Sequence, residues 1–321
     1  MRAVVYEKYG PPEVLQIKEF EKPVPKSNEV LIKVYSTAVT VGDVRLRKAD
    51  PFMARAFNGF FKPKQQILGM NYSGVVEATG QNVNEFKTND KVYGSTNFAF
   101  GTYAEYICVK EDSVITKKPE NIDFGQAAAL PFGTLTSLYF LRKGKIKNGD
   151  KILIYGASGS LGTAAVQLAK YLGAEVSAVC SASNIELVKS LGAGKVIDYT
   201  KEDFSEMPDN YEIIYDTVGK IPFLKCMKKL KPKGIYLDAV HIPPVAFYKD
   251  IWTAVTSNKK IIGGTFTERK EDLLFLNDLI KKGLHKPVMD KRYPFEQISE
   301  AHRYVDMGHK KGNVVVTIVN E

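Results

Sequence analysis

The sequence predicts an α/β protein that combines a doubly wound, six-stranded parallel sheet with a small antiparallel β-barrel. Residues 151–266 alternate short apolar strands with short helices, which is typical of βαβ units and a parallel sheet. Residues 2–110 instead hold short runs rich in Val, Tyr and Ile, without a long helical period. A glycine-rich turn follows the first strand of the alternating region.

Composition places the chain among ordinary globular proteins. It has 321 residues, of which 44% are hydrophobic and 25% charged, enough for two domains with buried cores. The net charge of +9 is compatible with nucleic acid, an anionic membrane surface or an anionic cofactor. Its densest basic stretch, residues 225–233, is interleaved with apolar residues and is interpreted as a solvated helix end. No nucleic-acid motif is found, so no nucleic-acid partner is predicted.

Cysteine usage and hydropathy predict a soluble, cytoplasmic protein. Cys108, Cys180 and Cys226 are widely spaced and form no Cys-x-x-Cys motif, which favours a reducing compartment. The first residues, MRAVVYEKYG, have no apolar signal core. The longest charge-free run, residues 124–141, is interrupted by Gly and Pro and is predicted to be buried domain-junction structure, with no membrane span.

The first and last parts of the chain are predicted to build the barrel. Its strands are expected within residues 2–9, 29–39, 72–80, 90–98 and 102–110, with a turn near residues 43–48. Two helices are expected at residues 272–283 and 299–308. The last strand, residues 312–319, has no helix after it, so we expect it to return to the N-terminal β region.

The middle of the chain is predicted to form the parallel sheet. Its six strands are expected at residues 151–156, 175–180, 195–199, 212–219, 234–240 and 260–266. The helices between them are expected at residues 163–173, 184–192 and 222–230, and the first two end at glycines, as helices commonly do.

The turn after the first of these strands is a candidate dinucleotide site. Glycines let the backbone turn tightly and approach a pyrophosphate, which the amides at the following helix N-terminus then bind. The spacing is G-x-x-G-x-x-G, and the alternative is a glycine turn without a ligand. The candidate cofactor-binding residues here are Gly156, Ser158, Gly159, Ser160, Leu161 and Gly162.

The end of the second strand favours NADPH over NADH. An Asp or Glu there would bind the ribose hydroxyls of NAD, but the chain has Ser181, Ser183 and Asn184 and no acid before Glu186. Hydroxyl and amide groups can donate to a 2′-phosphate, whereas a carboxylate repels it. The two serines can also cap the next helix. Tyr199, after the third strand, is expected either beside the adenine or as a sheet-end aromatic.

Motifs along nearly the whole chain resemble the medium-chain dehydrogenase/reductase superfamily. They include RAVVYEKYGPPEVL, GDVRLRKAD, ILGMNYSGVVEATG, LPFGTLTSLYFL, GASGSLGTAAVQLAKYLG, LVKSLGAGKVIDY, YDTVG and GHKKGNVVV. Within that superfamily, the chain is most similar to the zinc-free quinone oxidoreductase branch, in the subgroup of the chloroplast-envelope quinone oxidoreductase homologues.

The resemblance implies a GroES-like catalytic domain with an inserted Rossmann domain. Residues 1–122 and 267–321 would form the catalytic domain, and residues 123–266 the NADP-binding domain. It also implies a homodimer through the sheet edge at residues 263–266. Further cofactor contacts are implied at Gly264, Thr265 and Phe266, beside the nicotinamide, and at Lys310, Gly312 and Asn313, near the cofactor edge.

The residues that would bind a catalytic zinc are missing. In the alcohol-dehydrogenase branch a Cys and a His hold the metal, and the corresponding positions here resemble Thr40 and Met70. The histidines, His241, His285, His302 and His309, show no metal-ligand spacing. The sequence therefore predicts no metal, which disfavours the oxidation of simple alcohols.

The remaining chemistry is hydride transfer from NADPH to a quinone or an α,β-unsaturated carbonyl (an enone), with donors for the developing oxyanion. Candidate catalytic donors are Thr40, Asn71, Tyr72 and Thr136, each of which can instead make structural hydrogen bonds. Asp43 is expected to hold the loop. The aromatic and basic residues 52–66 are expected to line an acceptor pocket, to cover the cleft, or to pack against the barrel. The alternative functions are an NADP-dependent carbonyl or alcohol oxidoreductase, and a non-catalytic NADPH-binding sensor or RNA-binding protein.

Overall fold

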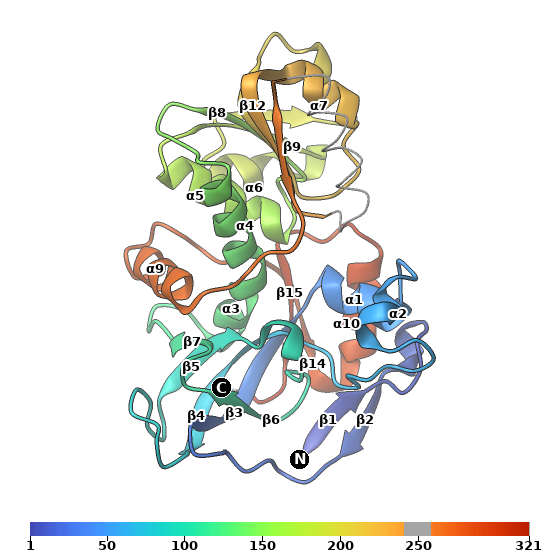
Figure 1. Cartoon of the computed structure of the whole chain (residues 1–321), viewed down its shortest axis with the longest axis vertical. Helices are drawn as coiled ribbons and strands as arrows, with labels where there is room; N and C mark the ends of the chain where they lie inside the picture. The colour runs from blue at the N-terminus through green and yellow to red at the C-terminus, as the bar shows by residue number, and fades with distance from the viewer. Residues whose placement is uncertain (241–257, 321) are drawn as a thin grey trace. The chain divides into compact units, whose positions relative to one another are not determined.

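The structure is a computed structural model that describes residues 1–240 and 258–320. The chain forms two compact units (Figure 1). The first unit comprises Met1–Phe132 and Arg269–Glu321, and the second comprises Gly133–Glu268. The domain boundaries predicted from the sequence remain a prediction. Helix α3 (Phe124–Ala129) packs against strands of the first unit.

The second unit is built on a six-stranded parallel sheet, which confirms the predicted doubly wound architecture. The strand order is β10-β9-β8-β11-β12-β13. Because all the strands are parallel, their carboxyl ends lie at the same edge of the sheet. The strands are β8 (Lys151–Tyr155), β9 (Glu175–Cys180), β10 (Lys195–Asp198), β11 (Tyr211–Asp216), β12 (Leu230–Asp238) and β13 (Lys260–Gly263).

Helices cover both faces of this sheet. Ile214 lies in a core cluster with Cys226 and Met227 of α7 (Phe223–Lys229). Successive strand residues point to opposite faces, so Tyr215 points the other way, and its ring lies 5.9 Å from that of Phe140. Phe140 belongs to α4 (Pro131–Lys143). The other helices of this unit are α5 (Ser160–Tyr171), α6 (Ile185–Ser190) and the short 3₁₀ turns η3 (Ala182–Asn184) and η4 (Phe204–Glu206).

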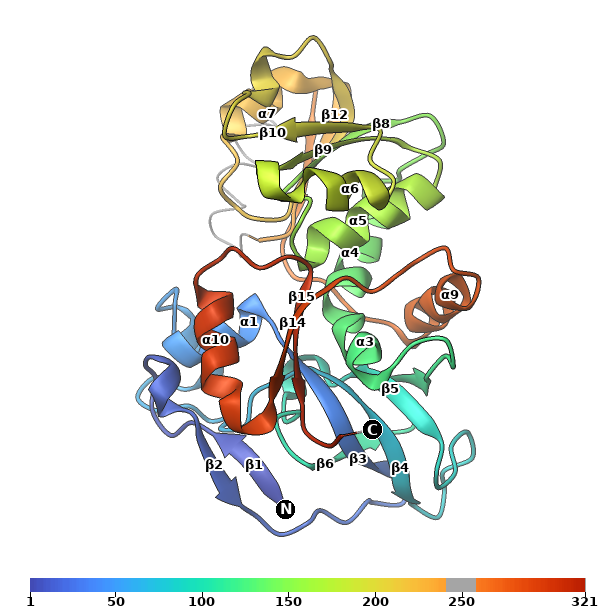
Figure 2. The same ribbon diagram turned by 180° about the vertical axis from the view of Figure 1, so that it is seen from behind.

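The first unit is built on a seven-stranded sheet with the order β14-β15-β3-β4-β5-β7, in which β6 also pairs with β3. A separate pair consists of β1 (Arg2–Val5) and β2 (Gln16–Glu19). The C-terminal strand β15 (Asn313–Thr317) pairs antiparallel with β3 (Glu29–Val39), which confirms its predicted return (Figure 2). The other strands are β4 (Asn71–Thr79), β5 (Lys91–Ser95), β6 (Tyr106–Lys110), β7 (Val114–Lys117) and β14 (Met289–Pro294).

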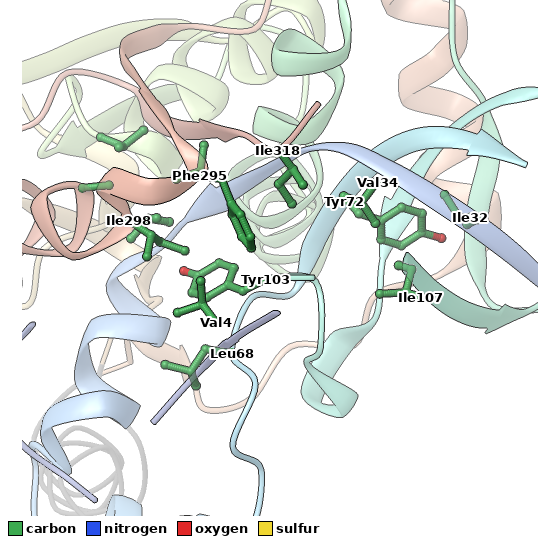
Figure 3. Close-up of a cluster of buried hydrophobic side chains, with 14 of the residues drawn as sticks. Val4, Ile32, Val34, Leu68, Tyr72, Tyr103, Ile107, Phe295, Ile298 and Ile318 are labelled. Carbon is green, nitrogen blue, oxygen red and sulfur yellow. The ribbon is translucent and has the colours of Figure 1, made fainter. Parts of the chain in front are cut away.

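Helices of the first unit lie against this sheet and beside its loops. Helix α10 (Ile298–Asp306) packs on β14 and β15 (Figure 2). The remaining helices are α1 (Val41–Lys48), α2 (Ala54–Asn58) and α9 (Lys270–Lys281), with the 3₁₀ turns η1 (Pro12–Val14), η2 (Asn97–Ala99) and η5 (Phe295–Gln297). Figure 3 shows part of the core that these elements enclose, with the Tyr103 ring among Val4, Ile298 and Phe295.

Candidate functional site

Two glycines of the turn between β8 and α5 are required by the packing of the chain itself. Gly156 has a φ of +81°, and a Cβ atom there would lie 2.1 Å from Cγ2 of Val218. A Cβ atom on Gly162 would lie 2.2 Å from the carbonyl oxygen of Gly156. Non-bonded atoms do not approach so closely, so a larger residue would not fit at either position. The two glycines therefore let α5 begin directly against the end of β8.

Gly159 is different, because nothing in the described chain requires it to be glycine. Its φ of −80° and ψ of −178° suit any residue, and a Cβ atom would meet only the Gly156 oxygen, at 3.6 Å. Gly159 is the N-cap of α5, and Ser160, Leu161 and Gly162 supply the free backbone amides of its first turn. The space beside Gly159 therefore fits a group that approaches the helix N-terminus closely, as a pyrophosphate does.

A cluster of hydroxyl and amide groups lies next to this turn. The side-chain amide nitrogen of Asn184 donates to Oγ of Ser158 at 3.1 Å and to Oγ of Ser181 at 3.0 Å. The Oγ atoms of Ser181 and Ser183 lie 3.4 Å apart. Asn184 is buried, and its Oδ1 atom has no partner. The structure thus brings Ser181, Ser183 and Asn184, which the sequence predicted for the 2′-phosphate, next to Ser158 of the predicted glycine turn, and we call these four residues the hydroxyl cluster.

The surroundings of the hydroxyl cluster include an acid that the sequence analysis missed. Asp198 ends β10 and pairs in register with Cys180, and the Ala182 amide donates to it. Its carboxylate accepts from Thr200, and these hydrogen bonds hold the pKa of Asp198 below its usual value. The signal was present in the sequence, because an acid that ends the strand next to β9 must lie near residue 181. Tyr199 follows it, half exposed, with its amide bonded to the Cys180 carbonyl at 3.2 Å.

The remaining predicted cofactor contacts are divided between the two units. Gly264, Thr265 and Phe266 follow β13, so they lie at the same sheet edge as the glycine turn. Lys310, Gly312 and Asn313 lie in the first unit. The ammonium group of Lys310 donates to the Gly312 carbonyl at 2.6 Å, and burial lowers the pKa of Lys310 to about 8. Asn313 donates to the Val288 carbonyl. Contact of these three residues with the cofactor remains a prediction.

Two of the four predicted donors, Thr40 and Tyr72, lie in the packed interior of the first unit. The Thr40 hydroxyl caps α1: it donates to Oδ2 of Asp43 at 2.6 Å and accepts from the Asp43 amide. Its one proton is therefore used, and donation to a substrate would require this bond to break. The Tyr72 ring is fully buried among Val34 and Ile107 of the barrel core (Figure 3), and its hydroxyl is buried without a hydrogen-bond partner among the described residues.

Asn71 keeps an unused polar atom. It begins β4 and is buried, and its main-chain oxygen accepts from Oγ1 of Thr37 at 2.7 Å. The side-chain Oδ1 atom is buried without a hydrogen-bond partner. Such an atom costs free energy unless a ligand satisfies it. Thr136, the fourth predicted donor, is buried in α4.

A chain of buried polar groups supports the segments that carry Thr40 and Asn71. Asp43 is fully buried and accepts from the amides of Thr40 and Gly69 and from the Tyr103 hydroxyl. The hydroxyl oxygen of Tyr103 in turn lies 3.1 Å from Nε2 of His302. Burial raises the pKa of Asp43, and these donors oppose that rise. Asp43 thus connects the start of α1 to the loop before β4.

The other end of this chain of contacts fixes the His302 tautomer. Nε of Arg47 lies 3.3 Å from Nδ1 of His302, and a guanidinium can only donate, so Nδ1 accepts and Nε2 carries the proton. Arg47 is fully buried and donates a hydrogen bond to the Gly10 carbonyl. Its Nη2 atom lies 3.5 Å from Oδ2 of Asp306. Burial and the Arg47 charge lower the pKa of His302 from 6.5 to about 3.

The two buried histidines should make the fold sensitive to acid. Burial also lowers the pKa of His285 from 6.5 to about 4. Below pH 6.5 the unfolded chain binds protons on both imidazoles and the folded chain does not, so stability falls as pH falls toward 4. At pH 5 each imidazole should cost about 2 kcal/mol. Urea unfolding at several pH values measures the free energy of unfolding, and His302→Gln should remove about half of its change with pH. An unchanged pH dependence in that variant would contradict the account.

No metal centre is found in the part of the chain that the structure describes. Among residues 1–240 and 258–320, no group of three or more His, Cys, Asp or Glu side chains could hold a metal ion. Met70, at the position resembling a histidine ligand, is buried and packs near Gly42. His241 lies outside the described residues. No helix among the described residues is long and apolar enough to cross a membrane.

Comparison with known proteins gives consistent matches over both units. A family model described as "Alcohol dehydrogenase GroES-like domain" matches residues 26–120, and one described as "Zinc-binding dehydrogenase" matches residues 191–316. The NADPH-dependent alkenal/one oxidoreductase of Arabidopsis thaliana is 33% identical over 98% of this chain and 79% of its own length. The chloroplast envelope quinone oxidoreductase homolog of the same plant is 30% identical over 98% of each chain. The solved quinone oxidoreductase from Coxiella burnetii has a TM-score of 0.89 and 29% identity over 99% of each chain.

Proposed function

The chain belongs to the medium-chain dehydrogenase/reductase superfamily, in its quinone oxidoreductase branch, and on this premise we propose that it is an NADPH-dependent reductase of quinones or α,β-unsaturated carbonyls. The observation that carries the proposal is the open space beside Gly159 next to the hydroxyl cluster. The relatives support the acceptor class through their names, alkenal/one and quinone oxidoreductase.

The second unit would hold the cofactor through neutral groups. The α5 N-terminus offers amides and the positive end of the helix dipole to the pyrophosphate. Ser158, Ser181, Ser183 and Asn184 would donate to the 2′-phosphate. The nearest cation on α6, Lys189, is 3.4 Å from Glu186 and so is partly neutralised. When bound, NADPH supplies the hydride for the reduction.

The first unit would orient the acceptor and meet its developing charge. For an enone, the reduction forms a C–H bond at the β-carbon and adds a proton at the α-carbon, so the carbonyl oxygen becomes more negative before protonation. We propose that Asn71 contacts the ligand, because its buried Oδ1 atom has no partner in the described chain and the side-chain amide can turn so that an N–H faces an oxyanion. Thr136 remains a proposed second donor. We assign Thr40 to capping α1 and Tyr72 to filling the core.

The hydroxyl cluster makes cofactor preference testable by one added charge. The Oγ atom of Ser183 lies 3.4 Å from that of Ser181, so Ser183→Asp places a carboxylate beside the Ser181 hydroxyl, where it repels a 2′-phosphate. The ratio of kcat/KM for NADPH to that for NADH should fall at least about ten-fold. Ser190→Asp adds the same charge at the far, exposed end of α6 and should leave the ratio unchanged. An unchanged ratio in Ser183→Asp would contradict the assignment.

A turnover assay distinguishes the proposed function from its alternatives. The purified protein is titrated with NADPH and NADH, and both are then offered as donors to 9,10-phenanthrenequinone and to a panel of enones. Oxidation of NADPH with either acceptor class supports the reductase. Turnover of saturated alcohols with NADP⁺ alone would instead indicate a carbonyl or alcohol oxidoreductase. NADPH binding without any turnover, or salt-dependent RNA binding, would favour the non-catalytic alternatives.

We also propose a homodimer formed through β13. This strand lies at the edge of the sheet and pairs only with β12 among the described strands, so its outer side could extend the sheet into a second copy. Light scattering tests the oligomeric state. A cytoplasmic location and the absence of nucleic-acid binding stay predictions, and the two Arabidopsis relatives are named as chloroplast proteins.

A further inference from the structure

The segment after α1 exposes an unusual number of large apolar side chains. Five side chains between residues 52 and 61 are each more than half exposed, from 57% at Phe60 to 90% at Phe61. None of them belongs to the core cluster of the first unit. Exposed apolar surface of this extent marks an interaction site more often than chance. We call these side chains the aromatic patch: Phe52, Met53, Phe57, Phe60 and Phe61.

The segment that carries the aromatic patch is anchored to the first unit. The Asn58 amide donates to the Tyr6 hydroxyl at 2.6 Å, and the Tyr9 hydroxyl donates to the Gly59 carbonyl at 2.7 Å. Three of the rings also contact one another, with 5.6 Å between the ring centres of Phe52 and Phe60 and 5.5 Å between those of Phe60 and Phe61. The exposed rings are therefore presented by a fixed backbone.

Cations surround the aromatic patch. The Arg55 guanidinium lies over the Phe52 ring at 5.0 Å, and Lys62 and Lys64 follow the last phenylalanine. Within the described chain, neither lysine ammonium group forms an ion pair, and both side chains are exposed. Residues 51–70 contain no Asp or Glu, so this stretch supplies no acid to neutralise these cations.

Rings with flanking cations and no acid match the chemistry of a bilayer interface. Aromatic side chains settle at the level of the lipid headgroups, and Lys and Arg bind anionic headgroups. An acceptor pocket would enclose the rings, whereas these point outward. We propose that the aromatic patch, with Arg55, Lys62 and Lys64, is a docking surface for membranes that contain anionic lipids. Such attachment is interfacial and needs no spanning helix.

The docking surface has a use that rests on the proposed function. Many quinones and long-chain enones partition into bilayers, because they are apolar. A reductase held at the interface would meet these acceptors where they are concentrated. Docking itself is measured without NADPH or acceptor, so a negative result for docking leaves the proposed reduction untouched, and the converse also holds.

Vesicle flotation of the full-length protein tests the docking surface. Vesicles of phosphatidylcholine alone are compared with vesicles that also contain phosphatidylglycerol. Binding to the anionic vesicles should be at least about ten-fold stronger, and Lys62→Glu/Lys64→Glu should lose about ten-fold or more of it. Phe57→Ser/Phe61→Ser should lose vesicle binding to a similar extent, because the rings, once inserted among the lipids, contribute the apolar part of the binding free energy.

Matched controls separate the docking surface from general properties of the chain. Lys228→Glu/Lys233→Glu changes the net charge equally on exposed lysines of the second unit, and Leu224→Ser/Leu274→Ser removes two other exposed apolar side chains. Both controls should keep binding within about two-fold of the original. Thermal unfolding confirms that each variant is folded.

Three outcomes would overturn the proposal: no binding to anionic vesicles, an equal loss of vesicle binding in the two charge-reversal variants, or unchanged vesicle binding in Phe57→Ser/Phe61→Ser. If the protein binds no vesicles and Phe57→Ser/Phe61→Ser loses self-association, the patch is a protein interface. A fall in kcat/KM for a water-soluble acceptor in Phe57→Ser/Phe61→Ser, with vesicle binding unchanged, would assign the patch to the acceptor pocket.

Discussion

Replacing Gly159 with alanine is expected to lower the affinity for NADPH about 100-fold while the protein stays folded. The backbone at Gly159 accepts any residue, and the new methyl group would meet only one atom of the chain, at 3.6 Å. The same methyl group would hold a pyrophosphate away from the α5 amides, and hydrogen bonds to charged groups are worth about 1.5–3 kcal/mol each. Isothermal titration with NADPH measures the affinity.

Gly162→Ala is the matched control for this experiment, because it adds the same methyl group three residues later. There the Cβ atom would lie 2.2 Å from the Gly156 carbonyl, so the start of α5 must shift. We expect this variant to lose about 2 kcal/mol or more of stability, whereas Gly159→Ala should lose about 1 kcal/mol through weaker N-capping. Equal loss of stability in the two variants, or unchanged NADPH affinity in Gly159→Ala, would contradict the assignment of the space beside Gly159 to the pyrophosphate.

Replacing Asp43 with asparagine is expected to destabilise the first unit by about 3 kcal/mol. Every group that faces the carboxylate is a donor: the Thr40 amide and hydroxyl, the Gly69 amide and the Tyr103 hydroxyl. An asparagine NH₂ group must face at least one of them, so two donors would oppose each other at a fully buried position. Urea unfolding measures the loss.

Asp50→Asn is the control for the Asp43 prediction, because Asp50 is exposed and seven residues further along the chain. It should change stability by no more than about 0.5 kcal/mol. If the two variants were equally stable, the polar chain from Asp43 to Arg47 would not hold the loops of the first unit. Under conditions in which Asp43→Asn stays folded, we expect a lower kcat and an unchanged NADPH affinity. The reason is that Asp43 holds the Gly69 amide, and Gly69 precedes the proposed ligand contact Asn71 by two residues.

The parallel sheet, and the position of the glycine turn beside the hydroxyl cluster, were largely predictable from the sequence. Strand–helix alternation specifies right-handed parallel units, and the strand order then brings residues 156, 181 and 199 to one edge. The helices α3 and α4 were missed because residues 124–141 are apolar on all sides, so no helical period stands out. Strand β14 was missed because its sequence, MDKRYP, is charged and lies on the sheet edge.

The donor side chains were less predictable, because their availability depends on contacts between distant residues. The role of Thr40 did have a local signal, because a Thr followed three residues later by an Asp is the spacing of a capping box. Nothing in the sequence shows that Tyr72 lies on the core face of β4 rather than facing a ligand. The link from Asp43 through Tyr103 to His302 joins residues more than 250 positions apart along the chain, which only the folded barrel can bring together.

The most direct test of the account follows a labelled hydride. The protein is incubated with NADPH that carries deuterium at the transferable position and with an enone, and the product is analysed by mass spectrometry and NMR. The account predicts one deuterium at the β-carbon of the saturated ketone for each NADPH oxidised, with the α-carbon proton taken from water. Deuterium at the carbonyl carbon of an allylic alcohol would instead identify a carbonyl reductase, and full NADPH binding without transfer to any enone or quinone would contradict the proposed function.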